Sequence, residues 1–234
     1  MFPFCEQKRS GRSYEGQLQC EGDDRGMNEP ARQVSSRSDF AQIPVRSCLG
    51  DDAIRLGTMV YDHSQEPGAH NTPAAEEGND RLSHLKGKYG ELVFSEWLSA
   101  NRLAASHTPF RDNYRVKVFD DDFIINQKRV EIKTKRRGEA SAFPPSIKYN
   151  VNMGLRDLSH DIYVFVEIDP TGSFEQDPAA AIVGWATPRL VEIVGVRQVP
   201  GQLSANGKFK FKRYDWDLEI RRLYKPSLLR QQFD

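Results

Sequence analysis

Asp122-Phe-Ile-Ile-Asn-Gln-Lys-Arg-Val-Glu-Ile-Lys133 is the stretch that decides the fold. Two β-rich runs flank the polar residues 126–128, which predicts a tight β-hairpin. Because side chains alternate along a strand, Glu131 and Lys133 share one face. A two-residue turn at 126–127 places Asp122 opposite Glu131, and a turn at 127–128 places it opposite Lys133. Either register gathers the three charges on one face, whereas a three-residue turn would separate them.

Two carboxylates and an ammonium group on one face of a sheet point to a metal-dependent site. Like charges this close repel each other, and partial burial raises the cost. A divalent cation removes the conflict, and Mg²⁺ prefers one or two carboxylates together with water and phosphate oxygens. A neighbouring lysine can orient or deprotonate an attacking water, whose pKa the metal lowers. These are the components of metal-assisted phosphodiester hydrolysis.

The order of these residues resembles the signature of the PD-(D/E)XK nuclease superfamily, which includes restriction endonuclease-like enzymes and Holliday junction resolvases. The matching positions are Asp122 and, after a short gap, Glu131-Ile-Lys133. Glu91 lies upstream on a predicted helix, where the superfamily often has an acidic residue. The resemblance covers roughly residues 81–229. One departure is Asp121, which stands where the superfamily often has proline.

The resemblance implies an α/β fold with a mixed central sheet of about five strands flanked by helices. It also implies a DNA endonuclease that depends on Mg²⁺, with Mn²⁺ as a substitute. Asp122 would be the principal metal ligand, Glu131 the second and the Ile132 carbonyl the third. Lys133 would orient the water and stabilise developing charge. Glu91 would be an outer or second-metal ligand; the alternative is a solvated residue paired with Lys88 or Ser95.

The charge distribution is compatible with a polyanionic partner such as DNA. Residues 1–80 contain 8 basic and 14 acidic residues, and the remainder contains 25 and 19, although the whole chain is neutral. A basic second part favours DNA, and a solvated lysine-rich surface is the alternative. Candidate contacts with DNA are Lys135, Arg136, Arg137, Lys148 and Asn150.

Residues 1–80 are predicted to be a poorly structured N-terminal tail, with the nuclease domain at 81–234. Gly, Ser and charged residues dominate the tail, so little apolar surface is available to offset ordering entropy. The short runs 40–45 and 54–61 are candidates for a strand or for docking onto the core. Cys5, Cys20 and Cys48 do not form a Cys-x-x-Cys pair, and a zinc site with His63 or His70 is a minor alternative. No signal peptide or membrane-length apolar run is present, which predicts a cytoplasmic protein without a membrane partner.

Hydrophobic periodicity predicts the other elements. A helix is expected over 81–105, where Gly87 and Gly90 suggest close approach of another element. Strands are expected at 114–119, at 161–168 with both faces buried, and at 180–185. Residues 146–152 indicate either a strand or a helix start. Thr187 is expected to cap a helix over 188–194. The alternating run 208–214 indicates a strand facing DNA or a lysine-protected edge, followed by a closing strand within 214–223 and a short helix at 226–230.

Three alternatives remain open. The first is another activity on the same core, either an exonuclease or a branched-DNA resolvase, and a resolvase or palindrome cutter is expected to be a homodimer. The second is a nucleic-acid-binding module without catalysis. The third is an interaction protein with an accidental Glu-x-Lys hairpin, which predicts that Glu91 lies far from the hairpin.

Overall fold

The computed structural model describes residues 32–65, 81–110, 121–136, 148–152, 158–169, 173–203, 210–211 and 214–234. Its strands form a five-stranded sheet in the order β1-β6-β5-β3-β2 and a three-stranded sheet in the order β4-β8-β7. The bounds are β1 Ala41–Ile43, β2 Phe123–Ile125, β3 Lys128–Arg136, β4 Lys148–Asn152, β5 Ile162–Ile168, β6 Ala180–Ala186, β7 Val196–Gln198 and β8 Asp215–Glu219. The α-helices are α2 Leu49–Ser64, α3 Arg81–Ala100 and α4 Pro188–Val194.

The large sheet is mixed, as predicted. Strands β3 and β5 are parallel, and the other neighbouring pairs are antiparallel. Every residue of β5 and β6 is buried, which confirms two central strands covered on both faces. The α/β fold predicted from the sequence is therefore present.

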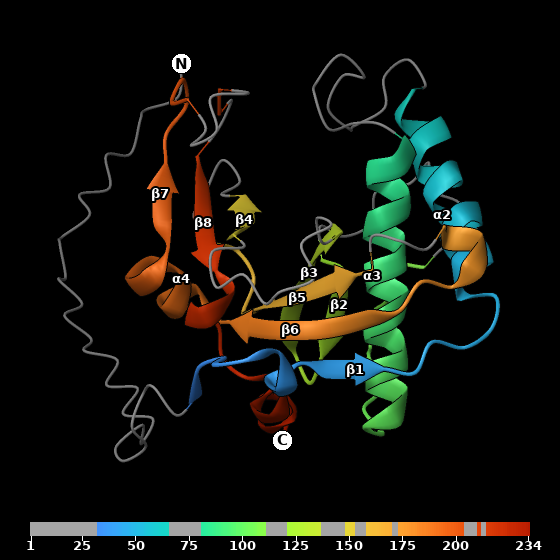
Figure 1. Ribbon diagram of the computed structural model, residues 1–234, viewed down its shortest axis with the longest axis horizontal. Coiled ribbons are helices and arrows are strands. Elements are labelled where there is room, and N and C mark those ends of the chain that lie inside the picture. The colour runs from blue at the N-terminus through green and yellow to red at the C-terminus, as the bar shows by residue number, and fades with distance from the viewer. Residues whose placement is uncertain are drawn as a thin grey trace, which may run out of the picture.

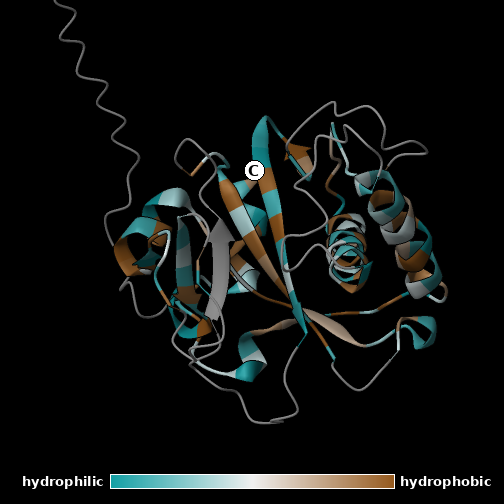
Figure 2. Ribbon diagram, turned by 90° about the horizontal axis from the view of Figure 1, so that it is seen from above, coloured by the Kyte–Doolittle hydropathy of each residue, from teal (hydrophilic) through white to brown (hydrophobic). Residues whose placement is uncertain are grey.

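Two hydrophobic clusters lie on opposite faces of the large sheet. Helices α2 and α3 lie side by side (Figure 1) and pack with alternate residues of β5, such as Val164 and Val166. The other residues, such as Tyr163 and Phe165, pack with α4 and β8. Figure 2, seen from above, shows the helix pair apart from the small sheet, with the large sheet between them. The small sheet thus lies over the face of β3 and β5 that is turned away from α3.

The predicted boundary at residue 80 is wrong, because part of the proposed tail belongs to the domain. Strand β1 pairs with β6, and Leu49, Ala53 and Leu56 of α2 are buried in the core. Asp177 accepts the backbone N–H groups of Cys48 at 3.0 Å and Gly50 at 2.6 Å, which satisfies donors at the start of α2. The remainder of the proposed tail, residues 1–31 and 66–80, lies outside the described residues.

Helix α3 ends at Ala100, five residues earlier than predicted. Arg102 has a φ of 56°, and the Leu103 N–H donates to the Leu98 carbonyl at 3.0 Å. A left-handed residue followed by a 6→1 hydrogen bond is the Schellman motif, which commonly ends a helix. The chain then turns toward β2, where the His107 carbonyl accepts the Ile124 N–H at 3.2 Å.

The C-terminal predictions are confirmed in part. Thr187 accepts the Leu190 N–H through its side chain and caps α4. Strand β8 lies within 214–223, but the helix expected at 226–230 is two 3-10 turns, Pro226–Leu228 and Arg230–Gln232. Further 3-10 turns are Arg37–Asp39, Phe174–Gln176 and Ile220–Arg222. The strands predicted at 114–119 and over most of 208–214 lie outside the described residues.

Candidate active site

The hairpin forms with the first of the two expected registers. Ile125 pairs with Lys128 and Phe123 with Val130, which leaves a two-residue turn at 126–127. Asn126 and Gln127 have φ values of 46° and 67°, and positive φ at both central residues is typical of the type I′ turn that suits strand twist. The ladder ends at Phe123 and Val130, so Asp122 precedes β2 and the alternation of the hairpin does not extend to it.

The alternation along β3 separates its charged face from its core face. Val130 and Ile132 are buried in the cluster that contains α3. Glu131 aligns with Tyr163 across the parallel ladder, on the opposite face. Lys133 Nζ lies 2.5 Å from Glu131 Oε1, and both side chains are mostly buried. The charged face of the hairpin is therefore a sheltered surface beside the small sheet.

The backbone of β3 holds the third residue of the hairpin motif. The Ile132 N–H donates to Asp122 Oδ2 at 2.7 Å, so the carboxylate is fixed against the strand that carries Glu131. The role assigned to the Ile132 carbonyl stays a prediction, since this contact uses the amide group of that residue.

Helix α3 brings Glu91 to the same site. Glu91 is 8% exposed, and its Oε2 lies 2.6 Å from Lys88 Nζ. Burial raises the pKa of Glu91, the Lys88 ammonium lowers it, and the negative charge of Glu131 raises it further. The pairing with Lys88 is thus present, but in a buried position. The influence of Glu131 contradicts the alternative that placed Glu91 far from the hairpin.

Asp122 lies where these negative charges add. Burial raises the pKa of Asp122 well above its ordinary value, and the charges of Glu131 and Glu91 raise it further. The Ile132 N–H and the Lys88 ammonium act in the opposite direction. The net effect on the pKa is upward, because burial and the two negative charges outweigh the Ile132 N–H and the Lys88 ammonium.

Close contact between α3 and β3 sets the position of Glu91. A Cβ on Gly90 would lie 1.8 Å from Thr134 Oγ1, whereas a Cβ on Gly87 would meet nothing within 4 Å. The predicted close approach is therefore confirmed for Gly90 and is wrong for Gly87. Only glycine lets the helix approach the strand this closely at position 90.

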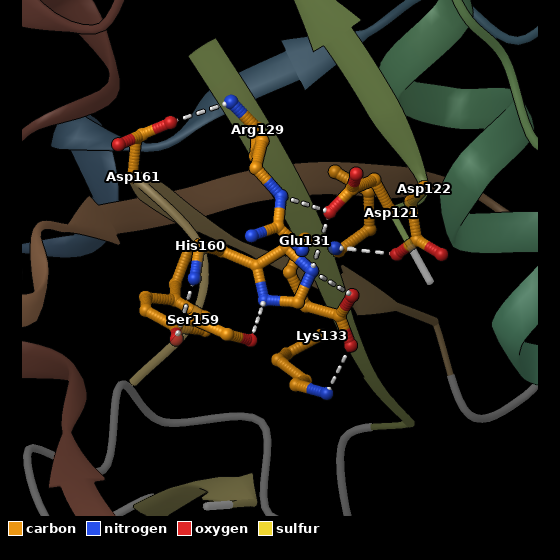
Figure 3. A network of polar contacts seen from close by, with 10 residues as sticks. Asp121, Asp122, Arg129, Glu131, Lys133, Ser159, His160 and Asp161 are labelled. Carbon is orange, nitrogen blue, oxygen red and sulfur yellow. Dashed lines mark hydrogen bonds and ion pairs between the residues drawn. The ribbon is translucent and has the colours of Figure 1, made fainter. Parts of the chain in front are cut away.

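Sequence reasoning missed a group of polar side chains next to Glu131 (Figure 3). His160 Nε2 lies 3.2 Å from Asp121 Oδ1 and 3.4 Å from Glu131 Oε2. Asp121 Oδ1 also accepts from Arg129 Nε at 2.6 Å. The sequence pointed to Asp121 only as a departure from proline, and because β2 begins at Phe123, strand alternation does not place its side chain. The signal for His160 was its position just before a buried strand, within Ser159-His160-Asp161.

The structure describes the side chains of two of the five candidate DNA contacts, Lys135 and Arg136. Lys135 is exposed and continues the face of Lys133. The Arg136 guanidinium lies 4.9 Å from the centre of the Phe174 ring, which belongs to the core cluster of α2 and α3, so Arg136 points to the other face of β3 from Lys135, and its contact with DNA stays a prediction. Lys148 and Asn150 belong to β4 of the small sheet, where they pair with Glu219 and Asp217. Arg137 and the side chains of Lys148 and Asn150 lie outside the described residues.

The chain matches no family model, no curated protein and no solved structure. The resemblance to the PD-(D/E)XK superfamily therefore stays a prediction from the residues quoted above. Within the described ranges, no helix has the length and apolar character needed to cross a membrane.

The donor set fits Mg²⁺ in its chemistry. Asp122, Glu131 and Glu91 offer carboxylate oxygens, the ligands this ion prefers, and a cation would offset the charge that raises the pKa of Asp122. Among the side chains that the structure describes, no three His, Cys, Asp or Glu residues form a ready-made metal site. The minor zinc alternative also has no support there, since Cys48 is a free, exposed thiol.

Proposed function

We propose that the chain is a Mg²⁺-dependent DNA endonuclease that hydrolyses phosphodiester bonds, with Mn²⁺ as an alternative ion. The observation that carries the proposal is the group of carboxylates that the hairpin and α3 bring close enough to influence one another, with Asp122 fixed to the backbone of β3. Asp122, Glu131 and Glu91 influence each other electrostatically while Lys133 contacts Glu131. Burying like charges is costly, so this arrangement favours a site for a cation over a structural role.

Each side chain has a distinct part in the proposed reaction. Asp122 and Glu131 would hold the ion, and the Ile132 N–H keeps Asp122 oriented. Bound Mg²⁺ would neutralise charge on the phosphate and assist ionisation of the attacking water. Lys133, beside Glu131, would orient that water and stabilise the charge that develops on the phosphate. Glu91 remains paired with Lys88 and would contribute as an outer ligand.

Cleavage of supercoiled plasmid tests the proposal. The wild-type protein is incubated with Mg²⁺, with Mn²⁺ and with EDTA, beside Lys133→Ala. Lys86→Ala removes the same charge from α3 and serves as the matched control. We expect nicking that requires the metal, falls about 10²–10³-fold in Lys133→Ala and persists in Lys86→Ala.

Two further measurements separate the alternatives. Fragments from plasmid, linear duplex and a four-way junction distinguish an endonuclease from an exonuclease and from a resolvase, and sedimentation tests the homodimer expected of a resolvase. If neither metal supports cleavage of any of these substrates, the nuclease proposal is wrong. DNA affinity that falls with salt would then favour a binding module.

A further inference from the structure

His160 occupies the space between two carboxylates, and the proposed reaction gives it no part. Its Nε2 atom is 3.2 Å from Asp121 Oδ1 and 3.4 Å from Glu131 Oε2, and its side chain is 11% exposed. The nitrogen is buried and makes a hydrogen bond with neither oxygen, so it lies within contact distance of both carboxylates without being committed to one. Figure 3 shows the ring lying between Asp121 and Glu131.

The other atoms of His160 are held from its own segment. Ser159 Oγ lies 3.2 Å from Nδ1, and the His160 N–H points to the Tyr163 hydroxyl at 3.4 Å. The ring also packs edge-on against Tyr163, the residue aligned with Glu131 on the neighbouring strand. Position and tilt of the imidazole are thereby coupled to the strand that lies beside Glu131.

Asp121, which faces His160, is also held by a contact with a second residue. Its Oδ1 accepts from Arg129 Nε at 2.6 Å. The backbone of Arg129 is joined to Asp161 twice, by Arg129 N–H to Asp161 Oδ2 at 2.8 Å and by Asp161 N–H to the Arg129 carbonyl at 2.9 Å. Asp161 directly follows His160. The Asp121–Arg129 ion pair, the two Arg129–Asp161 hydrogen bonds and the contact of His160 with Asp121 therefore form a closed ring.

We propose that His160, oriented by Asp121, is a positioning residue that fixes the Glu131 carboxylate for metal binding. Each oxygen of Glu131 then has its own partner, Lys133 at Oε1 and His160 at Oε2. A glutamate held at both oxygens loses less conformational freedom when it binds an ion. Partners behind a metal ligand commonly change metal affinity 10–100-fold when they are removed. The inference rests on the proposed function, because it assigns Glu131 as a ligand.

Mn²⁺ binding, measured by electron paramagnetic resonance without DNA, tests the inference directly. His160→Phe keeps the ring and removes both nitrogens, and His160→Gln restores a donor near Nε2. We expect the Kd for Mn²⁺ to rise about 10–100-fold in His160→Phe, and His160→Gln to recover most of the affinity. His84→Phe, on α3, is the control for loss of a histidine elsewhere.

Nuclease kinetics give the second readout. His160→Phe should raise the Mg²⁺ concentration needed for half-maximal cleavage and lower kcat, with KM for DNA unchanged. Thermal unfolding of each variant shows whether it is folded. If His160→Phe does not fold, Asp121→Asn carries the test, since it removes the orienting charge and should weaken Mn²⁺ binding in the same direction.

The outcomes separate the two proposals. Glu131→Gln must weaken Mn²⁺ binding; if it does not, the proposed metal site itself is wrong. If Glu131→Gln weakens binding but His160→Phe does not, only the inference about His160 is wrong. Equal loss in His160→Gln and His160→Phe would also overturn it, because the nitrogen would then act as a ligand and not as a positioning donor.

Discussion

Replacing Gly90 by alanine should destabilise the protein, whereas the same change three residues earlier, at Gly87, should stabilise it. At Gly90 the new Cβ would lie 1.8 Å from Thr134 Oγ1 and 2.9 Å from Thr134 Cβ, so α3 or β3 must move. Overpacking of a core costs about 1–3 kcal/mol, and alanine returns about 1 kcal/mol over glycine in a helix. Because the overlap reaches the Cβ of Thr134, we expect an overpacking cost of about 3 kcal/mol and, after the gain of about 1 kcal/mol in helix propensity, a net loss of about 2 kcal/mol.

Gly87 is the internal control, since its added Cβ meets nothing within 4 Å. Gly87→Ala should therefore gain about 0.5–1 kcal/mol through helix propensity and reduced freedom of the unfolded chain. For a protein of this size, we expect Tm to rise by about 1–4 °C in Gly87→Ala and to fall by about 4–8 °C in Gly90→Ala. Urea unfolding and calorimetry measure both quantities.

A third variant tests the cause of the Gly90 effect. Thr134→Ala removes the hydroxyl and methyl groups that the new Cβ would meet, so Gly90→Ala with Thr134→Ala should lose less stability than the separate effects add up to. Equal stability of Gly90→Ala and Gly87→Ala would refute the contact between α3 and β3. Strictly additive effects at 90 and 134 would refute it equally.

Three further results are expected. Burial raises the pKa of Asp122, so the stability that this group contributes is full below its ordinary pKa of 3.8 and is lost as pH rises through its higher folded pKa. Asp122→Asn should therefore be more stable than wild type in urea at about pH 8 but not at about pH 4. The same variant should lose the rise in Tm that Mg²⁺ gives the wild type. Lys88→Met leaves Glu91 buried without its partner and should cost about 3–5 kcal/mol near neutral pH, with a smaller loss in acid, where Glu91 takes up a proton; an equal loss at both pH values would contradict this. Asp177→Ala removes the acceptor at the start of α2 and should lower the free energy of unfolding by about 0.5–2 kcal/mol, whereas Asp177→Asn keeps an acceptor and should be close to wild type. An Asp177→Ala variant as stable as wild type would contradict the stabilising role of these hydrogen bonds.

The hairpin was predictable because local chemistry determines it. Turn residues and strict alternation predict the turn and put Glu131 and Lys133 on one face before any tertiary contact is considered, but the alternation does not extend to Asp122, which precedes β2. The buried strands β5 and β6 were predictable for a similar reason, since short, near-continuous apolar runs are typical of strands that are buried on both faces. The position of Glu91 followed from the helical spacing of α3 combined with the resemblance to a nuclease core.

The contacts of His160 and Asp121 depend on tertiary structure and were missed for that reason, as was the burial of the Lys88–Glu91 pair. His160 reaches Glu131 only because β5 lies parallel to β3, with Val130 aligned to Ile162, and a parallel register cannot be deduced from either strand alone. Lys88 is an ordinary surface residue type, and only the packing of α3 buries it with Glu91. Helix α2 was overlooked because its buried residues Leu49, Ala53 and Leu56 stand among charged ones, although their spacing is helical.

The hairpin turn makes contacts that bear on the order of folding. The Asn126 side chain donates to the Phe233 carbonyl and Lys128 Nζ to the Gln232 carbonyl, across 107 and 104 positions of the chain. A hairpin closes within microseconds, but contacts of such long range form slowly because the intervening chain must first be ordered. We therefore expect the turn to form early and its contacts with the Phe233 and Gln232 carbonyls to form late. Glu91 on α3 would then meet the hairpin carboxylates Asp122 and Glu131 only as the core closes, so the repulsion by Glu91 would slow the final step and leave the early hairpin unaffected.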